Sequence, residues 1–527
     1  MRALIAGLLA ASALVAAQVW PEAHPPTGQQ PRRPRAYTPY TYPKSPAQLW
    51  REETPALLNH AAEARRALDE TIARGPYAGT PSSIAEHRTP EWLVDAKFGM
   101  FVDWGPWSVA GWAPQAEKAT YPDWYEKRLF EEFRTYHEQT WGADIRPDDL
   151  IQLLDGGGFD SGALVRLARD AGMRYVVPFL KHHGGYALWD STYTHRDSVE
   201  WGLRRDVARE FADACRASGL RYGAYVSLGE WNYPLLVNGA LQSVSFAGAP
   251  AGPLDPGAPF LSGKVPVPDY ARDYLVPSLQ ELIDRTDPDL LWFDGEWEAP
   301  ASVWRSPEIA AYYYDRAAAR GRDVAINDRF GKDTRGKAGW GDYFTSEYHV
   351  IEGFEPHPWE ENRSLSHSYG YNWEEASDDR YVLSEDDALD LLLRVVANGG
   401  NLLLMVSPDG SGHVPENQIR RLRFIGGWLS RYGEAIYGTR PLGVATQPSW
   451  GYLTRSKGGD RIYCVVRHWP ADGRLEVPID RPVRRAGTMF SEVPVQVEKR
   501  GAGLTTLQLG QTTPPDPHAS VVVLTLQ

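Results

Sequence analysis

Short apolar runs with the length of buried strands alternate with amphipathic helical patterns over most of this chain. This alternation limits the possible folds more than any other feature, because it is typical of βα units around a parallel sheet. About eight strand-like runs are present, and eight such units predict a closed (β/α)8-like barrel of the α/β class. The predicted strands cover residues 97–102, 174–180, 221–226, 290–293, 324–327, 343–345, 365–369 and 401–406. Helical patterns occupy residues 161–171, 206–218, 274–285, 307–320 and 386–397.

Changes of composition divide the chain into further segments. Residues 18–45 are rich in Pro, Arg and Tyr without an apolar period, which is typical of a linker. The alternating pattern and the helices that flank it place the (β/α)8-like domain at residues 46–439. Over residues 440–527, short β-branched runs separated by Gly and Pro predict a β-sandwich domain. The long loop at residues 232–268 is unusual inside a compact domain, so we expect it to be either functional or poorly ordered.

The first 17 residues have the pattern of a signal peptide. Arg2 precedes an apolar run over residues 3–15, and Val15-Ala16-Ala17 provides a small-residue cleavage site. The run is too short to span a bilayer comfortably, and no later stretch is apolar enough to do so. We therefore expect a secreted or periplasmic protein without a membrane span.

Composition narrows the choice of partner. The formal net charge of −13 argues against nucleic acid or an anionic membrane surface. Cys215 and Cys464 lie far apart and provide neither a disulfide framework nor metal-site spacing, and no phosphate-binding glycine loop is present. The chain contains 20 Trp and 27 Tyr but only 15 Phe. Rings that combine a flat apolar face with a polar edge suit sugars, so this bias points to carbohydrate.

Polar and aromatic side chains follow six of the predicted strands at the point where each strand ends. Asp294 is the clearest case, because it comes directly after the apolar run Leu290-Leu291-Trp292-Phe293. Ligand sites of parallel α/β proteins lie at the carboxyl ends of the strands, so these side chains are expected to form one site. The six endings are Asp103-Trp104-Gly105, Lys181-His182-His183, Gly229-Glu230-Trp231, Asp294-Gly295, Asn327-Asp328-Arg329 and Ser346-Glu347-Tyr348.

The adjacent histidines His182 and His183 have two interpretations. Imidazole is the commonest metal ligand, which would favour a metal site. Consecutive strand residues point to opposite faces, however, and no further histidine cluster supplies the remaining ligands. We favour neutral imidazoles that bond to substrate hydroxyls over a metal site.

Two carboxylates in a Trp-rich exported barrel without a nucleotide motif indicate glycoside hydrolysis. That reaction needs one carboxylate to attack or to activate water, and a second acid to protonate the leaving oxygen. Asp294 is the candidate for the first role, and the second acid must remain protonated. Glu230 and Glu347 lead by strand position, and spacing does not choose between them. The candidates for the second role are Glu230, Glu296, Glu298, Glu347 and Glu360.

Several segments between about Pro90 and Pro441 resemble the retaining α-L-fucosidase family, glycoside hydrolase family 29. The segments that carry the resemblance are Lys97–Val109, Lys181–Ser191, Leu291–Gly295, Asn327–Arg329, Glu347–His349 and Gly399–Leu404. The resemblance implies a (β/α)8-like catalytic domain, a C-terminal β-sandwich and no metal or other cofactor. It also implies double displacement through a covalent glycosyl-enzyme, with fucosylated or related L-sugar glycans as substrates.

The resemblance also assigns roles to residues. It implies that Asp294 is the nucleophile and that Glu347 is the acid/base of the broad-specificity branch. The residues that match those holding the sugar ring in the family are His182, His183, Tyr225, Trp292 and Arg329.

Three positions depart from the family pattern. Asp103 replaces a histidine, Gly184 replaces an aspartate, and Asp123-Trp124-Tyr125 stands for Glu-Trp-Tyr. The positions of Asp103, Asp123 and Trp124 are expected to contact the sugar. Because a carboxylate and an imidazole satisfy different hydroxyl arrangements, the reaction is expected to be retained while the glycone shifts, for example to L-galactose, L-glucose or a substituted fucose. A sugar-binding protein without catalysis and a metal-dependent barrel hydrolase are the alternatives.

Overall fold

The computed structural model describes residues 23–244, 250–254, 258–501 and 503–527. The predicted signal peptide at residues 1–17 lies outside the described residues. Within the described part of the chain, no helix is both long enough and apolar enough to cross a membrane.

Eight parallel strands form the barrel, and each lies beside the barrel strand that follows it in the chain. The sheet order is β8-β7-β3-β2-β1-β11-β10-β9. A parallel bridge between Asn327, just after β8, and Tyr343, just before β9, joins the two edge strands and closes the sheet. The predicted barrel is therefore confirmed. Its strands are β1 (Phe98–Val102), β2 (Tyr175–Lys181), β3 (Arg221–Ser227), β7 (Leu290–Asp294), β8 (Ala325–Ile326), β9 (Phe344–Glu347), β10 (Trp359–Ser364) and β11 (Asn401–Val406).

Amphipathic helices cover the outside of the barrel and bury one face against the strands. Several begin with a side-chain cap, as where Asp160, Asp206 and Ser384 accept hydrogen bonds from backbone amides of the first turn. The longer helices are α2 (Thr54–Arg74), α9 (Ser161–Asp170), α10 (Val207–Ser218), α11 (Val276–Thr286), α13 (Ser306–Ala318), α15 (Glu385–Ala397) and α16 (Glu416–Tyr432). The shorter ones are α1 (Pro46–Glu52), α3 (Pro81–Ile84), α4 (Glu91–Ala96), α5 (Trp107–Ala110), α6 (Tyr125–Arg128), α7 (Arg134–Thr140), α8 (Pro147–Leu153), α12 (Ala301–Trp304) and α14 (Trp373–Ala376).

The strand predicted at residues 365–369 is wrong, because the seventh barrel strand is β10 at Trp359–Ser364. This strand contains no apolar run. Its Glu360 lies inside the barrel and accepts hydrogen bonds from Tyr175 Oη (2.6 Å) and Trp292 Nε1 (2.9 Å). This strand thus consists largely of polar residues, one of which forms hydrogen bonds with residues of other barrel strands. A search for apolar runs does not detect a strand of this kind.

Two irregular segments pack against the barrel. The predicted linker is described from residue 23 onward, where Tyr37 is buried and donates a hydrogen bond to Asp149 (2.6 Å). The long loop at residues 232–268 contains a three-stranded antiparallel sheet of β4 (Tyr233–Val237), β5 (Ala240–Val244) and β6 (Pro250–Pro253). Phe260, from the same loop, is fully buried against Trp231 and Trp124.

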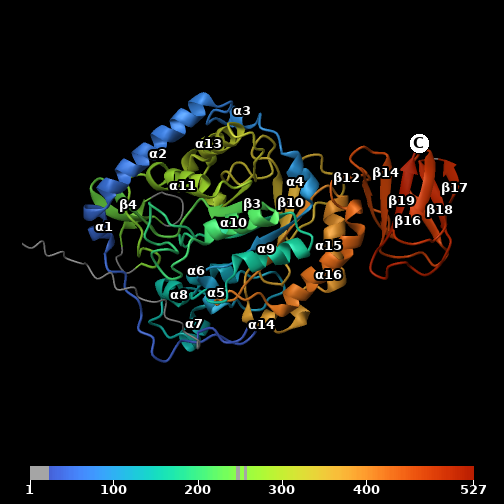
Figure 1. Ribbon diagram of the computed structural model, residues 1–527. Coiled ribbons are helices and arrows are strands. Elements are labelled where there is room, and N and C mark those ends of the chain that lie inside the picture. The colour runs from blue at the N-terminus through green and yellow to red at the C-terminus, as the bar shows by residue number, and fades with distance from the viewer. Residues whose placement is uncertain (1–22, 245–249, 255–257, 502) are drawn as a thin grey trace, which may run out of the picture.

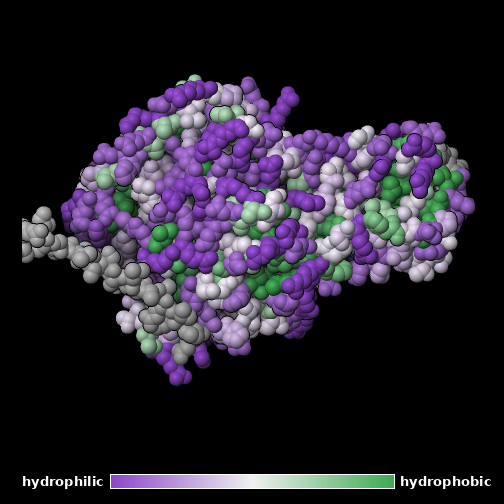
Figure 2. All heavy atoms as spheres, in the orientation of Figure 1, coloured by the Kyte–Doolittle hydropathy of each residue, from purple (hydrophilic) through white to green (hydrophobic). Residues whose placement is uncertain are grey.

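The C-terminal domain consists of two antiparallel sheets that face each other across their own apolar core. It lies beside α15 and α16, at one end of the molecule (Figure 1). The predicted β-sandwich is confirmed. One sheet contains β12 (Arg440–Pro441), β13 (Gly451–Arg455), β14 (Arg461–Val466), β19 (Ser520–Leu526) and β16 (Val483–Thr488), and the other contains β15 (Arg474–Val477), β18 (Leu504–Leu509) and β17 (Val495–Gly501). Hydrophilic residues predominate on the surface shown in Figure 2, while hydrophobic residues gather over these sheets.

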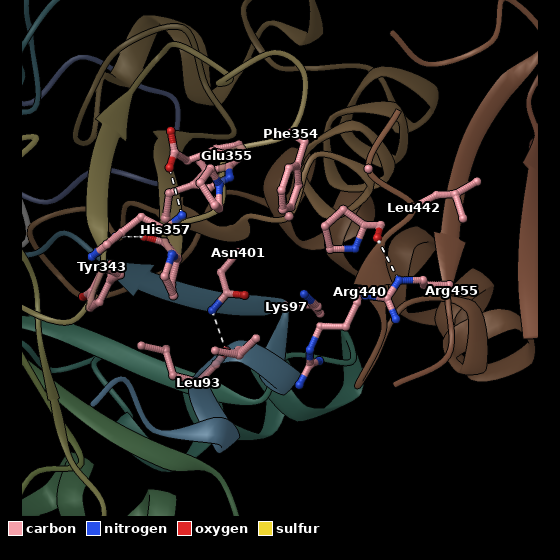
Figure 3. A pocket seen from close by; sticks show the side chains of 17 residues that line it. Leu93, Lys97, Tyr343, Phe354, Glu355, His357, Asn401, Arg440, Leu442 and Arg455 are labelled. Atoms are coloured by element: carbon pink, nitrogen blue, oxygen red, sulfur yellow. Dashed lines mark hydrogen bonds between the residues drawn. The ribbon is translucent and has the colours of Figure 1, made fainter. Parts of the chain in front are cut away.

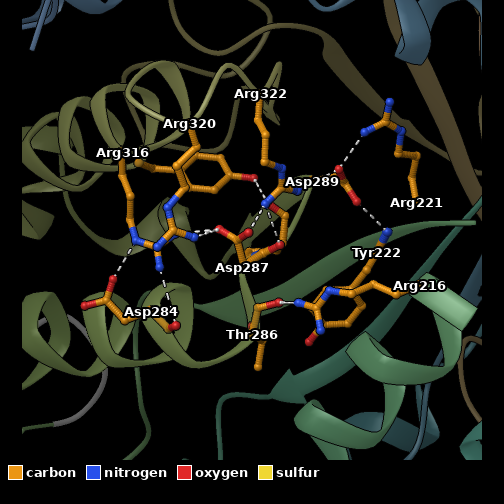
Figure 4. A network of polar contacts seen from close by, with 12 residues as sticks. Arg216, Arg221, Tyr222, Asp284, Thr286, Asp287, Asp289, Arg316, Arg320 and Arg322 are labelled. Carbon is orange, nitrogen blue, oxygen red and sulfur yellow. Dashed lines mark hydrogen bonds and ion pairs between the residues drawn. The ribbon is translucent and has the colours of Figure 1, made fainter.

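A network of ion pairs fixes the turn between α11 and β7 (Figure 4). Asp289 accepts hydrogen bonds from Arg221 (2.8 Å), Arg322 (2.8 Å) and the Tyr222 amide (3.0 Å). Asp287, in the left-handed conformation that ends α11, pairs with Arg316, Arg320 and Arg322. The network lies at the amino ends of β3 and β7, away from the strand tips that carry the predicted site.

Asp289→Ala is expected to lower the free energy of unfolding by about 2 kcal/mol, because it removes the acceptor of Arg221 and of the buried Tyr222 amide and one of the acceptors of Arg322. Urea unfolding measures this change. The exposed Asp323, on the same side of the barrel, provides the control, since Asp323→Ala should change stability by less than about 0.5 kcal/mol. An equal effect of the two substitutions would contradict the assigned role of the network.

Candidate active site

A cavity of about 220 Å³ opens at the carboxyl ends of the barrel strands. It brings together most of the side chains predicted from the strand endings and the family pattern. The predicted residues that line it are Asp123, Trp124, His183, Tyr225, Asp294, Arg329 and Glu347, and the lining is completed by Tyr121, Arg128, Trp297, Arg335 and Tyr369. Three further predicted residues, Asp103, His182 and Trp292, do not line it and are buried.

The guanidinium of Arg329 joins the two acids at the centre of the cavity. Its Nη1 lies 2.6 Å from Asp294 Oδ1, and its Nη2 lies 3.3 Å from Glu347 Oε2. The guanidinium is fixed from behind, because Nε donates to Thr345 Oγ1 (3.1 Å) and the group lies 4.5 Å from the ring centre of Trp292. One cation therefore binds both acids, Asp294 at the tip of β7 and Glu347 at the tip of β9, and both acids face the same cavity.

Each acid has a second partner that orients it. Tyr225 Oη donates to Asp294 Oδ2 (2.6 Å), and His183 Nε2 lies 3.8 Å from the same oxygen. Tyr121 Oη donates to Glu347 Oε1 (2.8 Å). The Asp294 side chain is 12% exposed and that of Glu347 is 23% exposed, so Glu347 lies nearer the mouth of the cavity.

The structure separates the five candidates for the second acid. Glu230 is buried between Lys181 Nζ (2.7 Å) and Lys264 Nζ (2.9 Å). Burial alone would raise its pKa, but the two ammonium groups outweigh burial and lower the pKa of Glu230 to about 2. A carboxylate held in this way does not carry a proton at neutral pH.

The other candidates also lie outside the cavity lining. Glu360 is in the barrel interior, where burial raises its pKa to about 7. Glu296 is buried beside the cavity with a pKa raised by burial to about 7, and Glu298 is exposed. Among the five acids only Glu347 lines the cavity with Asp294.

The two adjacent histidines are buried in different hydrogen-bonding environments. His183 Nδ1 lies 2.6 Å from Ser227 Oγ, while His182 Nε2 lies 3.5 Å from Asp123 Oδ2. Burial lowers the pKa of His182 to about 4 and lowers that of His183 well below its usual value, so both rings are neutral at pH 7. Among the described residues, no group of three or more His, Cys, Asp or Glu is arranged to hold a metal ion.

Three buried polar atoms beneath the cavity have no hydrogen-bond partner among the described residues: Asp103 Oδ2, Asp123 Oδ1 and His182 Nδ1. Asp103 is fixed through its other oxygen, which accepts from Trp107 Nε1 (2.7 Å). Burial and the charge of Asp123 raise the pKa of Asp103, and burial with the charges of Glu347 and Asp294 raises that of Asp123. Buried polar atoms normally have partners, and of these three residues Asp123 also lines the cavity.

Comparison with known proteins decides the family. The family model described as alpha-L-fucosidase matches residues 66–434. The chain belongs to the alpha-L-fucosidase family. It is 31% identical over 468 residues to an alpha-L-fucosidase of Dictyostelium discoideum (85% of this chain, 95% of that one). It is 28% identical over 461 residues to the human tissue alpha-L-fucosidase (86% of this chain, 91% of that one).

Solved structures agree with this assignment. The structure of the Thermotoga maritima alpha-fucosidase in complex with a mechanism-based inhibitor superposes with a TM-score of 0.67 at 29% identity, covering 85% of this chain and all of that one. The resemblance found in the sequence is confirmed, and this member of the alpha-L-fucosidase family is a glycoside hydrolase with a barrel domain and a C-terminal sheet domain.

Gly184, one of the three positions expected to depart from the family pattern, lies against the carboxyl group of Glu126. A Cβ added to Gly184 would lie only 3.2 Å from Glu126 Oε2. The Glu126 side chain is buried, its carboxyl lies 3.9 Å from Arg196 Nη2, and burial raises its pKa to about 7. Glycine at position 184 therefore leaves room for a carboxyl group that α6 supplies.

Sequence analysis missed the aromatic wall at the mouth of the cavity. Trp297 is 39% exposed, and its ring lies 6.2 Å from that of Trp124 at an interplanar angle of 24°. Its position three residues after Asp294 was the available signal, because residues just beyond a strand tip line the barrel mouth. An exposed indole at this position is suited to contact the part of a substrate that extends out of the cavity.

Trp297→Ala is expected to raise KM for an oligosaccharide about fivefold, equal to about 1 kcal/mol, with little change in kcat. An indole that contacts the leaving group equally before and during reaction would contribute to binding and not to the chemical step. Phe490→Ala removes an exposed ring of the C-terminal domain and is the matched control. A fall in kcat without a change in KM would contradict this role for Trp297.

Proposed function

We propose that this protein is a retaining, exo-acting glycoside hydrolase that releases α-linked L-fucose or a closely related L-sugar from oligosaccharides or glycoconjugates. The observation that carries the proposal is the single guanidinium shared by Asp294 and Glu347 at the cavity centre. Retaining enzymes need two carboxyl groups about 5–5.5 Å apart, one on each side of the scissile bond. The relatives, which are named alpha-L-fucosidases, support L-fucose as the reference sugar.

In the first step, Asp294 attacks the anomeric carbon of the sugar. The bond to the leaving oxygen breaks as Glu347 gives that oxygen its proton, so the products are a free alcohol, a glycosyl ester of Asp294 and the Glu347 carboxylate. The hydrogen bonds from Arg329 and Tyr225 to Asp294 orient the attacking oxygen. His183 and Tyr225 lie close enough to reach hydroxyls of the same ring.

In the second step, water hydrolyses the ester. Glu347 takes a proton from the water, whose oxygen attacks the anomeric carbon, and the sugar leaves with Asp294 restored as a carboxylate. The hydrogen bond from Arg329 to Glu347 does not involve Asp294, so Arg329 holds Glu347 at the cavity centre in both steps.

The size of the cavity supports exo action. Its 220 Å³ is below the roughly 300–1,000 Å³ of sites for larger ligands, which suits a single sugar ring. The exposed Trp297 lies where the remainder of the glycan would leave the cavity.

The glycone is proposed to differ in hydroxyl arrangement from that of the family pattern, because Asp123, which lines the cavity, and Asp103, which is buried outside its lining, each have a carboxyl oxygen without a partner among the described residues. Nitrophenyl α-L-fucoside, α-L-galactoside and α-L-glucoside test this proposal. We expect kcat/KM for one of the last two sugars to reach that for the fucoside. A preference for the fucoside above about a hundredfold would overturn the shifted glycone but keep the reaction. Binding of all three sugars without hydrolysis would instead indicate a catalytically silent carbohydrate-binding protein.

A further inference from the structure

A second and larger cavity, which we call the interdomain cavity, lies at the opposite end of the barrel from the candidate active site. Figure 3 shows the side chains that line it. Its volume is about 470 Å³. It is formed by α4, the residues before β10 and β11, and strands β12 and β13 of the C-terminal domain. Any molecule bound there would contact both domains, and it would not touch Asp294 or Glu347.

Lys97 lies at the centre of the interdomain cavity, between Asn401 and Arg440 (Figure 3). It is only 1% exposed, and its backbone is in the left-handed region (φ 64°) between the end of α4 and β1. Within the described part of the chain, its Nζ makes no hydrogen bond or ion pair. Burial and the charge of Arg440 lower the pKa of Lys97 to about 7. A buried amine without a partner is costly, so its position at a cavity points to a bound group that is absent from the protein itself.

Two more cations share this wall with Lys97. Arg440 pairs with Asp95 (2.6 Å), while Arg455 donates only to the Pro441 carbonyl (3.2 Å) in the described residues. Glu355 is the single acid among the residues that line the cavity, and its carboxylate accepts the backbone amide of His357 (2.8 Å). The lining residues thus carry three cations and one acid, and Asp95 and Glu91 behind Arg440 offset part of this positive charge. The positive charge that remains would attract an anion.

Much of the remaining lining is aromatic or apolar. Phe354 is 53% exposed and projects over the cavity (Figure 3), and the buried Trp359 also lines it. Leu93 and Leu442 add apolar surface from the two domains (Figure 3). Such a lining favours a bound molecule with a ring or another flat apolar part, and with an anionic group that faces the three cations.

We propose that the interdomain cavity is a second binding site, and that it takes a small aromatic or similarly flat molecule that carries one carboxylate or phosphate. The anionic group lies against Lys97, Arg440 and Arg455, and the flat body packs on Phe354 and Trp359. Because binding of an anion favours the charged form of the Lys97 amine, the complex takes up a proton above pH 7 and weakens as pH rises.

Pyridoxal phosphate is a suitable probe because it joins an aromatic ring and a phosphate to an aldehyde. The Lys97 amine adds to the aldehyde carbon and loses water to form an imine, and borohydride then supplies a hydride to carbon while water supplies a proton to nitrogen. Peptide mass spectrometry locates the resulting secondary amine. We expect Lys97 to be labelled at least about tenfold faster than the exposed Lys332, and excess phenyl phosphate but not phenol to protect it.

Two comparisons test whether the anionic group of the probe is required for binding. Pyridoxal, which lacks the phosphate, should label Lys97 at least about tenfold more slowly than pyridoxal phosphate does. Arg455→Gln should reduce the labelling by pyridoxal phosphate and weaken phenyl phosphate binding measured by calorimetry, whereas Arg485→Gln, at an exposed arginine of β16, should change neither. Equal labelling by both aldehydes, labelling of Lys97 no faster than of Lys332, or no effect of Arg455→Gln would each overturn the proposal. None of these readouts requires turnover, so they are independent of the proposed function.

Discussion

Asp294→Gly is expected to lower kcat on a nitrophenyl L-glycoside by at least about a thousandfold, equal to about 4 kcal/mol of activation free energy. The reason is that no other carboxylate in the cavity lies between Tyr225 and Arg329, where it could attack the anomeric carbon. Azide or formate, which fit the space left by the side chain, should restore part of the activity. Steady-state kinetics with and without added azide measures both effects.

The fold should survive this substitution, because Arg329 keeps Glu347 and Thr345 as partners. Thermal unfolding checks this point. Glu298→Gln changes an exposed acid four residues further along the chain and is the matched control, with activity expected within twofold of the parent enzyme. A glycine variant that retained full activity without azide would remove Asp294 from the mechanism.

The loss of rate caused by Glu347→Ala is expected to depend on the leaving group of the substrate. With an oligosaccharide, whose leaving alcohol needs a proton, kcat should fall about a thousandfold. With a nitrophenyl glycoside the loss in glycosylation should be far smaller, because nitrophenolate leaves without a proton. The comparison of the two substrate classes, each measured as kcat/KM, isolates the proton-donor role.

Glu230→Gln distinguishes this assignment from its main competitor. Glu230 neutralises Lys181 and Lys264, so the substitution should lower the free energy of unfolding by about 3 kcal/mol without any dependence of rate on the leaving group. If Glu230→Gln showed the leaving-group dependence and Glu347→Ala did not, the acid/base would be Glu230.

The sequence predicted the barrel well where strands carry apolar runs. The run Leu290–Phe293 is buried on both faces and was recognisable by composition alone. Strand β10 was missed because Glu360 and its neighbours are polar and depend on Tyr175 and Trp292, which are distant in sequence. Hydrogen-bond partners that are distant in sequence can be identified only from the folded barrel.

The site was predictable to the extent that it lies at strand tips. Asp294 and Glu347 were found because parallel strands end on one side of a barrel. Strand position alone left Glu230 and Glu347 equal, and only the family resemblance favoured Glu347, since Lys264, which pairs with Glu230 from the long loop, is 34 residues away. Tyr121 and Trp297 were missed because loop geometry, which has no periodic signal, brings them to the cavity.

The most direct test of the account is to trap the glycosyl-enzyme. A fluorinated fucosyl fluoride slows the hydrolysis of such an ester more than its formation, so the intermediate accumulates. We expect a mass increase of one sugar per protein, located in the peptide that contains Asp294, and loss of labelling in Asp294→Gly. A label on a different carboxylate, or turnover with inverted anomeric configuration and no label, would contradict it.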